Sequence, residues 1–331
     1  MVVLGVETSC DDTAAAVLLD GRTVLANLVS SQDAVHGPFG GVVPELASRQ
    51  HMRYILPIVD GALHKAGVGL RDLDGVAVTR GPGLVGSLLV GLSVVKGISF
   101  RWGIPYVGVN HLEAHLLAIF LEREVSFPYL ALLVSGGHTL LYLVRGFGEY
   151  LYLGGTRDDA AGEAYDKVAK MMGLGYPGGK IIDQLARQGD PKAVSFPRAR
   201  IKKGAYDFSF SGLKTAVWHY LNARDHYWEA EKADIAASFQ EAVVDMLVTP
   251  TLHAARERCV HRVVLAGGVA ANSRLRERML AEGGKQGLEI YFPAPALCTD
   301  NAAMVALSGH YWLARGCRDD LRLNADADLT L

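Results

Sequence analysis

The stretch LGVETSCDDTAAAVLLDG, residues 4–21, has the pattern of an apolar strand, a short polar turn and a second apolar strand. Much later in the chain, YLALLVSGGHTLLYLVRG, residues 129–146, repeats this plan with a different turn. In both stretches a strand with a buried pattern leads into small and polar residues and then returns. This repetition predicts two similar lobes, residues 1–126 and residues 127–331, the second with a helical insertion.

Helix and strand patterns alternate along the rest of the chain, which is typical of α/β proteins. Helices are expected at 44–67, 84–100, 111–122, 163–173, 180–189, 211–223 and 233–247, and strands at 75–80, 105–109, 262–266 and 289–293. In the helix at 233–247, an apolar stripe is expected from Ile235, Phe239, Ala242 and Met246. Pro250 is expected to end or kink that helix.

Composition points to an ordinary globular protein, since 50% of the 331 residues are hydrophobic and 21% are charged. The N-terminus shows no basic leader and no apolar run approaches the ~18 residues of a membrane span, so we expect a cytoplasmic protein that does not enter a membrane. The four cysteines show no Cys-x-x-Cys spacing, which indicates reduced thiols.

A formal net charge of −2 argues against a surface that binds nucleic acid throughout. Local basic stretches remain as candidates at 198–203, 256–262 and 274–278. Taken singly, a solvated helix face or loop is the commoner explanation for each stretch.

Glycines cluster where strands lead into helices, in GPGLVG (81–86), SGGHT (135–139), YPGGK (176–180) and AGGVAANS (266–273). Tight turns need glycine in any case, but four such loops favour a nucleotide site, because glycine lets the backbone approach phosphates closely. Asp166 and Asp183, on helices near these loops, can accept ribose hydroxyls, although an acid facing solvent is the commoner role. No Walker A sequence is present.

HLEAH, residues 111–115, places two histidines four residues apart, on one face of a helix, where they can share a divalent metal. A zinc protease has its general base directly after the first histidine, whereas Glu113 points towards the opposite helix face. A third ligand is required from elsewhere, and Asp300 would complete a set of two histidines and one carboxylate. Both Asp300 and Asn272 precede helices, so capping is the simpler role for each.

Ten motifs stand in order along the chain: ETSCDDT, GGVVPELASRQH, GPGLVGSLLVG, HLEAH, ALLVSGGHT, DDAAGEAYDKVAK, YPGG, DFSFSGLKT, AGGVAANS and CTDNAAM. Together they are too specific to occur by chance. By these motifs the chain resembles the TsaD family, the tRNA threonylcarbamoyladenosine transferases, also known as Gcp or O-sialoglycoprotein endopeptidase-like proteins. The resemblance runs from about residue 2 to about residue 315, and the tail after Gly316 carries no family signal.

The resemblance implies the ASKHA fold of actin, Hsp70 chaperones and sugar kinases, with two α/β lobes flanking a nucleotide cleft. It also implies transfer of a threonylcarbamoyl group from threonylcarbamoyl-AMP to N6 of adenosine 37 in tRNAs that read ANN codons, with release of AMP. One divalent metal, iron as Fe2+ with Zn2+ or Mg2+ as alternatives, would be held by His111, His115 and Asp300. The donor would be held by Leu133, Val134, Ser135, Gly136, Gly137, Asp166, Gly179, Asp183 and Asn272.

Asp11 and Asp12 are candidates for the general base by position and motif, although plain turn chemistry also explains them. One departure from the family is Asn110, where many relatives have a histidine; with the ligand pair intact, little effect on metal binding is expected. The implied partners are tRNA, and for a bacterial protein a TsaB-like paralogue and a TsaE-like ATPase. A homodimer also stays open.

Three other functions are compatible with parts of the sequence. A kinase-like ATPase or phosphotransferase of the same fold gives no role to His111 and His115. A nucleotide-regulated binding module of the Hsp70 type would need a peptide-binding domain. A metalloprotease is disfavoured by the position of Glu113.

Overall fold

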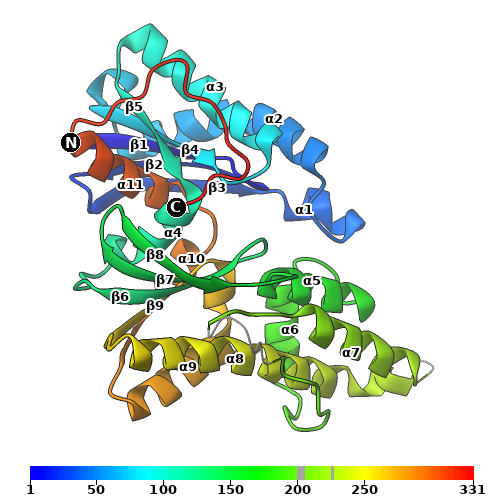
Figure 1. Cartoon of the computed structure of the whole chain (residues 1–331). Helices are drawn as coiled ribbons and strands as arrows, with labels where there is room; N and C mark the ends of the chain where they lie inside the picture. Colours follow the sequence, from blue (N-terminus) through cyan, green and yellow to red (C-terminus); the bar gives the residue numbers. More distant parts are fainter. Residues whose placement is uncertain (200–205, 225–226) are drawn as a thin grey trace. The chain divides into compact units, whose positions relative to one another are not determined.

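The computed structural model describes residues 1–199, 206–224 and 227–331. These form two compact units, coloured along the chain in Figure 1. Unit 1 comprises Met1–Val125 and Thr299–Leu331, and unit 2 comprises Ser126–Cys298. The lobe boundaries expected from the sequence differ in one respect: they assign the last residues to the second lobe, whereas Thr299–Leu331 packs within unit 1.

Unit 1 is built on a five-stranded mixed sheet with the strand order β3-β2-β1-β4-β5. Strands β1 to β3 pair antiparallel, while β4 and β5 run parallel to β1. The strands are β1 Val2–Glu7, β2 Asp12–Leu19, β3 Thr23–Ser31, β4 Gly75–Gly81 and β5 Tyr106–Asn110. The helices are α1 Asp33–His36, α2 Pro44–Ala66, α3 Val85–Trp102, α4 His111–Leu117 and α11 Ala302–Ala314.

Unit 2 repeats this plan with the strand order β10-β9-β6-β7-β8. Its first three strands pair antiparallel, and β9 and β10 extend the sheet in parallel. The strands are β6 Tyr129–Val134, β7 Thr139–Gly146, β8 Glu149–Gly155, β9 Arg262–Ala266 and β10 Glu289–Tyr291. The helices are α5 Ala161–Met171, α6 Gly178–Ala186, α7 Ser211–Asn222, α8 Lys232–Glu257, α9 Ser273–Lys285 and α10 Pro295–Cys298. The predicted α/β class with two related lobes is therefore confirmed.

Two sequence expectations about helices turn out differently. The stripe of Ile235, Phe239, Ala242 and Met246 is buried as predicted, but α8 continues through Pro250 instead of ending there. In unit 1, α3 is long and apolar enough by composition to cross a membrane, contrary to the expectation that no run approaches this length. This helix connects β4 to β5 and packs against α2 and β4. In the structure it is therefore part of the α/β fold of unit 1.

Small residues let α11 pack closely on the first sheet. A Cβ atom on Gly5 of β1 would lie 2.3 Å from the carbonyl oxygen of Ala302, and one on Gly309 would lie 2.1 Å from the Cβ atom of Ala77 in β4. Glycine is required at both places because the backbones approach so closely. This packing is why the last helix belongs to unit 1.

The tail that follows α11 covers the exposed edge of β5. Asp319 donates its backbone N–H to the Tyr106 carbonyl and accepts the N–H of Gly108 through its carboxylate at 2.8 Å. Further on, Leu323 packs against the apolar core of unit 1. Uncovered strand edges promote association with other chains, so this tail protects the sheet.

We expect truncation after Gly316 to lower the Tm by roughly 5–10 °C and to promote aggregation, because it uncovers β5 and part of the core. Leu323→Ala should reproduce part of this loss, about 1–2 kcal/mol. Leu321, in the same segment, is 49% exposed, so Leu321→Ala is a matched control that should leave the Tm nearly unchanged. Equal Tm values for the full and truncated chains in thermal unfolding would contradict a structural role for the tail.

Candidate metal centre and nucleotide-binding loops

The three candidate metal ligands come together in unit 1. His111 and His115 lie on α4, directly after β5, and Asp300 lies two residues before α11. Asn110 caps α4, since its side-chain oxygen accepts the N–H of Leu112 at 2.8 Å. Asn301, and not Asp300, caps α11. The prediction that Asp300 caps this helix is therefore wrong, and its carboxylate faces the histidines instead.

The ligand atoms of these three residues all lie within 4.8 Å of one another. The Nε2 atom of His115 is 3.0 Å from Oδ1 of Asp300, and the Nε2 atom of His111 is 3.6 Å from the same oxygen. Two imidazole nitrogens and one carboxylate oxygen thus converge on one point, while both histidines are buried. This donor set leaves coordination positions open and is compatible with Fe2+ or Zn2+.

Glu7, at the end of β1, orients His111 by contacting Nδ1, the ring nitrogen that does not face Asp300. Its Oε2 atom lies 3.1 Å from Nδ1 of His111 and accepts the hydroxyl of Thr79 at 2.7 Å. Burial lowers the pKa of His111, but the charges of Glu7 and Asp300 outweigh burial and raise it to about 9. Burial likewise raises the pKa of Glu7, but the neighbouring His111 more than offsets this, and the net pKa is lowered.

This arrangement fits a metal, because a carboxylate on Nδ1 is the usual partner of a histidine that binds a metal through Nε2. His115 differs from His111 in this respect. Within the described residues its Nδ1 atom is buried without a hydrogen-bond partner. The orientation of His115 therefore depends on the packing of α4.

Asp11 lies in the turn between β1 and β2, and Asp12 is the first residue of β2. Burial, together with the charges of Asp300 and Asp11, raises the pKa of Asp12 to about 8. Burial and Asp300 also raise the pKa of Asp11. A carboxyl group with a pKa near neutrality is suited to proton transfer.

His51 of α2 fixes this turn. Its Nε2 atom lies 2.9 Å from the Cys10 carbonyl and its Nδ1 atom 2.8 Å from the Thr13 hydroxyl. Because a carbonyl only accepts, Nε2–H donates to Cys10 and Nδ1 accepts from Thr13. Burial lowers the pKa of His51, which agrees with this neutral form.

The glycine-rich loop of unit 2 follows β6 and meets the N-terminus of α5. Gly162 donates its N–H to the Ser135 carbonyl at 3.2 Å, and a Cβ atom on Gly162 would lie 2.5 Å from that oxygen. Added Cβ atoms on Gly136 and Gly137 would meet nothing within 4 Å. The contact with Gly162 therefore fixes the loop at Ser135, while Gly136 and Gly137 face open space.

The other candidate nucleotide residues are engaged within unit 2. Asp166 accepts the N–H of Gly178 at 2.7 Å, next to Gly179. Asp183 accepts the hydroxyl of Ser273 at 2.7 Å. Both aspartates therefore lie beside glycine loops as expected, and neither simply faces solvent.

Both polar atoms of the Asn272 side chain make hydrogen bonds. Its oxygen accepts the N–H of Leu275, so it caps α9 as the sequence suggested, and its amide donates to Gln240 at 2.7 Å. Asn272 is 8% exposed. The structure thus bears out the capping role, and Asn272 is fixed in one orientation.

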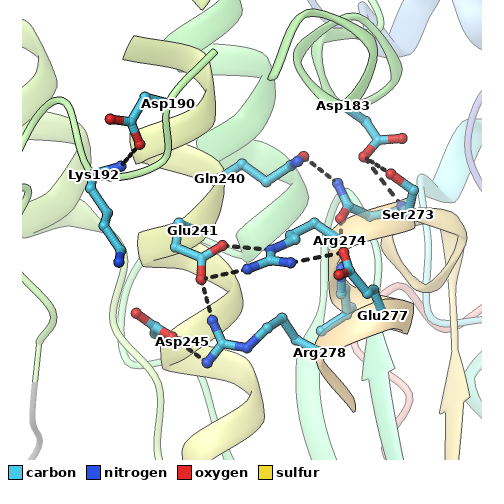
Figure 2. A network of polar contacts seen from close by, with 12 residues as sticks. Asp183, Asp190, Lys192, Gln240, Glu241, Asp245, Ser273, Arg274, Glu277 and Arg278 are labelled. Carbon is cyan, nitrogen blue, oxygen red and sulfur yellow. Dashed lines mark hydrogen bonds and ion pairs between the residues drawn. The ribbon is translucent and has the colours of Figure 1, made fainter. Parts of the chain in front are cut away.

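The basic stretch at 274–278 is neutralised inside unit 2. Arg274 and Arg278 of α9 both donate to Glu241 of α8, and Arg278 also pairs with Asp245 at 3.0 Å, as Figure 2 shows. A nucleic-acid patch at this stretch is therefore not supported. In the stretch 198–203, Arg198 pairs with Asp245, and residues 200–203 lie outside the described residues.

Sequence reasoning missed the orienting residues Glu7, Thr79 and His51. Glu7 and His51 stand in the ETSCDDT and GGVVPELASRQH motifs, but no local spacing connects them to HLEAH. Only the sheet brings them together. The one feature of the sequence that could have indicated Glu7 is its place as an acid at the carboxyl end of a buried strand, where functional sites of α/β proteins lie.

The two copies of one strand order, each flanked by helices, define a protein of the actin, Hsp70 chaperone and sugar kinase class. The fold is similar to that of component A of (R)-2-hydroxyglutaryl-CoA dehydratase from Acidaminococcus fermentans, with a TM-score of 0.56 and 19% identity over 95% of this chain and 99% of that chain. It is also similar to full-length HypF, with a TM-score of 0.62 and 13% identity over 94% of this chain and 55% of that chain.

The chain belongs to the TsaD family, tRNA N6-adenosine threonylcarbamoyltransferase, whose model matches residues 23–307. Two relatives of that name come from Syntrophotalea carbinolica, at 55% identity over 100% of this chain and 97% of the relative, and from Geobacter metallireducens, at 56% over 98% and 96%. The chain is therefore a transferase.

The two kinds of glycine can be separated by substitution. Gly162→Ala should destabilise unit 2 by about 1–3 kcal/mol, because its Cβ atom would collide with the Ser135 carbonyl. Gly136→Ala should leave the Tm unchanged but weaken AMP binding about 10-fold or more, because its methyl group occupies the open side of the loop. Thermal unfolding and calorimetric titration with AMP measure both effects. Wild-type AMP affinity in Gly136→Ala would rule out the loop as a nucleotide contact.

The raised pKa of Asp12 predicts how stability changes with pH in the metal-free protein. The folded state holds this proton up to a pH of about 8, whereas an unfolded aspartate loses it near 3.8. Stability from protonated Asp12 is therefore complete below a pH of about 4 and is lost as pH rises to about 8. Above that pH, Asp12→Asn should be more stable than wild type by on the order of 1–3 kcal/mol.

Urea denaturation with a chelator present, at about pH 5 and about pH 9, measures this difference. Asp60→Asn, at an exposed acid of α2, serves as the control. Parallel pH profiles for wild type and Asp12→Asn would contradict the assignment.

Proposed function

We propose that the chain transfers the threonylcarbamoyl group from threonylcarbamoyl-AMP to N6 of adenosine 37 in tRNAs that read ANN codons, and releases AMP. The observation that carries this proposal is the convergence of His111, His115 and Asp300 in a chain of this family. The competing kinase-like activity gives these three residues no role.

The chemistry requires positioning more than activation. The donor is a mixed carbamoyl-phosphoryl anhydride, so its carbonyl is already electrophilic and AMP is a good leaving group. The enzyme must orient the weakly nucleophilic adenine amine and stabilise the oxyanion that forms. A bound divalent metal supplies Lewis acidity for a carbonyl or phosphate oxygen.

The metal would be held by His111, His115 and Asp300. Fe2+ is the proposed ion, since two histidines and one carboxylate with open positions are typical of it, and Zn2+ also accepts this set. Mg2+ fits less well, because it prefers oxygen ligands. Glu7 keeps the proton of His111 on Nδ1 and leaves Nε2 for the metal.

The adenylate would be held by the loop of unit 2. Within the segment from Leu133 to Gly137, the backbone can approach the nucleotide at Gly136 and Gly137, which face open space. The N–H of Ser135 is already donated to the His138 carbonyl. Asp166 and Asp183 would accept ribose hydroxyls, because a carboxylate can accept further hydrogen bonds beside those it already makes. Gly179, near Asp166, and Asn272 complete this set.

Asp12 is the proposed general base, with Asp11 as its neighbour. In the metal-free protein its pKa of about 8 keeps it protonated at neutral pH. A bound cation would lower this pKa towards neutrality, where the carboxylate can accept a proton. It would receive the proton that the N6 amine loses when the new C–N bond forms.

The proposed partners are tRNA, a TsaB-like paralogue and a TsaE-like ATPase in the cytoplasm, with a homodimer as the alternative assembly. Support for a protein partner comes from apolar side chains on the neighbouring helices α2 and α3. Met52 and Leu56 are 63% and 62% exposed, and Val85 and Leu89 are 54% and 42% exposed. Exposed apolar groups at helical spacing are typical of a protein contact.

The direct test incubates the metal-loaded protein with threonylcarbamoyl-AMP and unmodified tRNA, alone and with the two partner proteins and ATP. Nucleosides are then digested and identified by mass spectrometry. We expect threonylcarbamoyladenosine from wild type and a loss of at least about 100-fold in His111→Ala, together with loss of bound metal.

His64→Ala, at an exposed histidine of α2, is the matched control and should retain both metal and activity. No modified nucleoside from the metal-loaded protein with both partners would refute the transferase and return the kinase-like ATPase to consideration. Equal activity in His111→Ala and wild type would refute the role of the metal.

A further inference from the structure

Glu113, the central acid of HLEAH, is buried on the side of α4 that faces away from the candidate metal ligands. Only 4% of this residue is exposed. Its Oε2 atom accepts the indole N–H of Trp312 at 2.9 Å. Trp312 lies in the last turn of α11, so this hydrogen bond connects two helices that are far apart in the sequence.

These two helices carry all three candidate ligands. His111 and His115 belong to α4, Asp300 lies two residues before α11, and the two helices pack against each other. The donor geometry of the site therefore depends on how α4 is oriented relative to α11. Any contact that fixes this orientation also fixes the distance from His115 to Asp300.

A helix as short as α4 cannot set its own orientation. It has seven residues, and isolated helices of this length are unstable in water, so tertiary contacts must hold it. A buried hydrogen bond to a charged group is among the stronger contacts available. Removing the donor leaves a buried carboxylate without that partner, which favours movement of the helix towards water.

We propose that Glu113 and Trp312 are a positioning pair that sets the geometry of the His111, His115 and Asp300 site. Glu113 acts through α4 and Trp312 acts through α11, and neither touches the metal. This inference rests on the proposed metal site. It gives the acid of HLEAH a role that is not proteolytic.

The test measures Co2+ affinity by competition with a chromophoric chelator, and records the visible absorption spectrum of bound Co2+. Trp312→Phe keeps a ring but removes the donor, and should weaken Co2+ binding about 10- to 100-fold and alter the spectrum. Glu113→Gln keeps an acceptor and should stay within about 3-fold of wild type. Trp218→Phe, at a half-exposed tryptophan of α7, is the matched control and should match wild type.

A double-mutant cycle separates positioning from general destabilisation. Glu113→Leu and Trp312→Phe should each weaken binding, and the double variant should be no weaker than the worse single variant. The Tm of the metal-free proteins is measured in parallel. Losses of affinity that multiply in the double variant, or that simply follow the Tm, would overturn the proposal.

The remaining outcomes separate this inference from the proposed function. If wild type binds Co2+ and forms threonylcarbamoyladenosine, but Trp312→Phe has the same affinity and spectrum, the positioning pair alone is refuted. If wild type binds no metal, the metal site and the positioning pair are both refuted, whereas the transferase assay still decides the reaction.

Discussion

The close packing of α11 on the first sheet is the constraint on which unit 1 depends. The helix can lie this close to the sheet only because Gly5 and Gly309 have no side chains, since a Cβ atom at either position would collide with the facing element. Asp300 stands 185 residues after His115, and this packing is what brings the two within 3.0 Å. A larger residue in either interface would displace the helix and move Asp300 away from the histidines. The site therefore depends on residues that carry no chemistry themselves.

Electrostatics in this region point to a positive charge as the natural occupant of the site. Burial raises the pKa of both Asp11 and Asp12, and the charge of Asp300 raises both further. The charges of Glu7 and Asp300 outweigh burial and raise the pKa of His111. Buried carboxyl groups that raise one another's pKa values are costly unless a cation offsets them. A divalent ion at Asp300 would relieve this repulsion. Metal binding and the protonation of Asp12 should therefore be linked, because a cation lowers the pKa of a neighbouring acid.

Local patterns made most of the fold predictable. The strand pairs at residues 4–21 and 129–146 and the α/β alternation are confirmed, because apolar periodicity reports burial directly. The third strand of each sheet, β3 and β8, was missed, since both are edge strands whose exposed residues hide the alternation. The histidine pair was visible from its spacing of four. The packing of Thr299–Leu331 into unit 1, and the contacts of Glu7 and Glu113, arise from tertiary structure that no local pattern encodes.

Glycine illustrates the same limit at a single position. In the sequence, Gly136 and Gly137 stand in the turn between two expected strands, and Gly162 stands directly before an expected helix, with nothing to separate their roles. In the structure, Gly162 is required because the Ser135 carbonyl lies where its Cβ atom would be, whereas Gly136 and Gly137 are bounded by nothing within 4 Å. Gly162 fixes the loop through its contact with Ser135, and Gly136 and Gly137 leave the loop backbone accessible. A loop that is fixed in this way loses little conformational entropy when a nucleotide binds, which favours tight binding by few contacts.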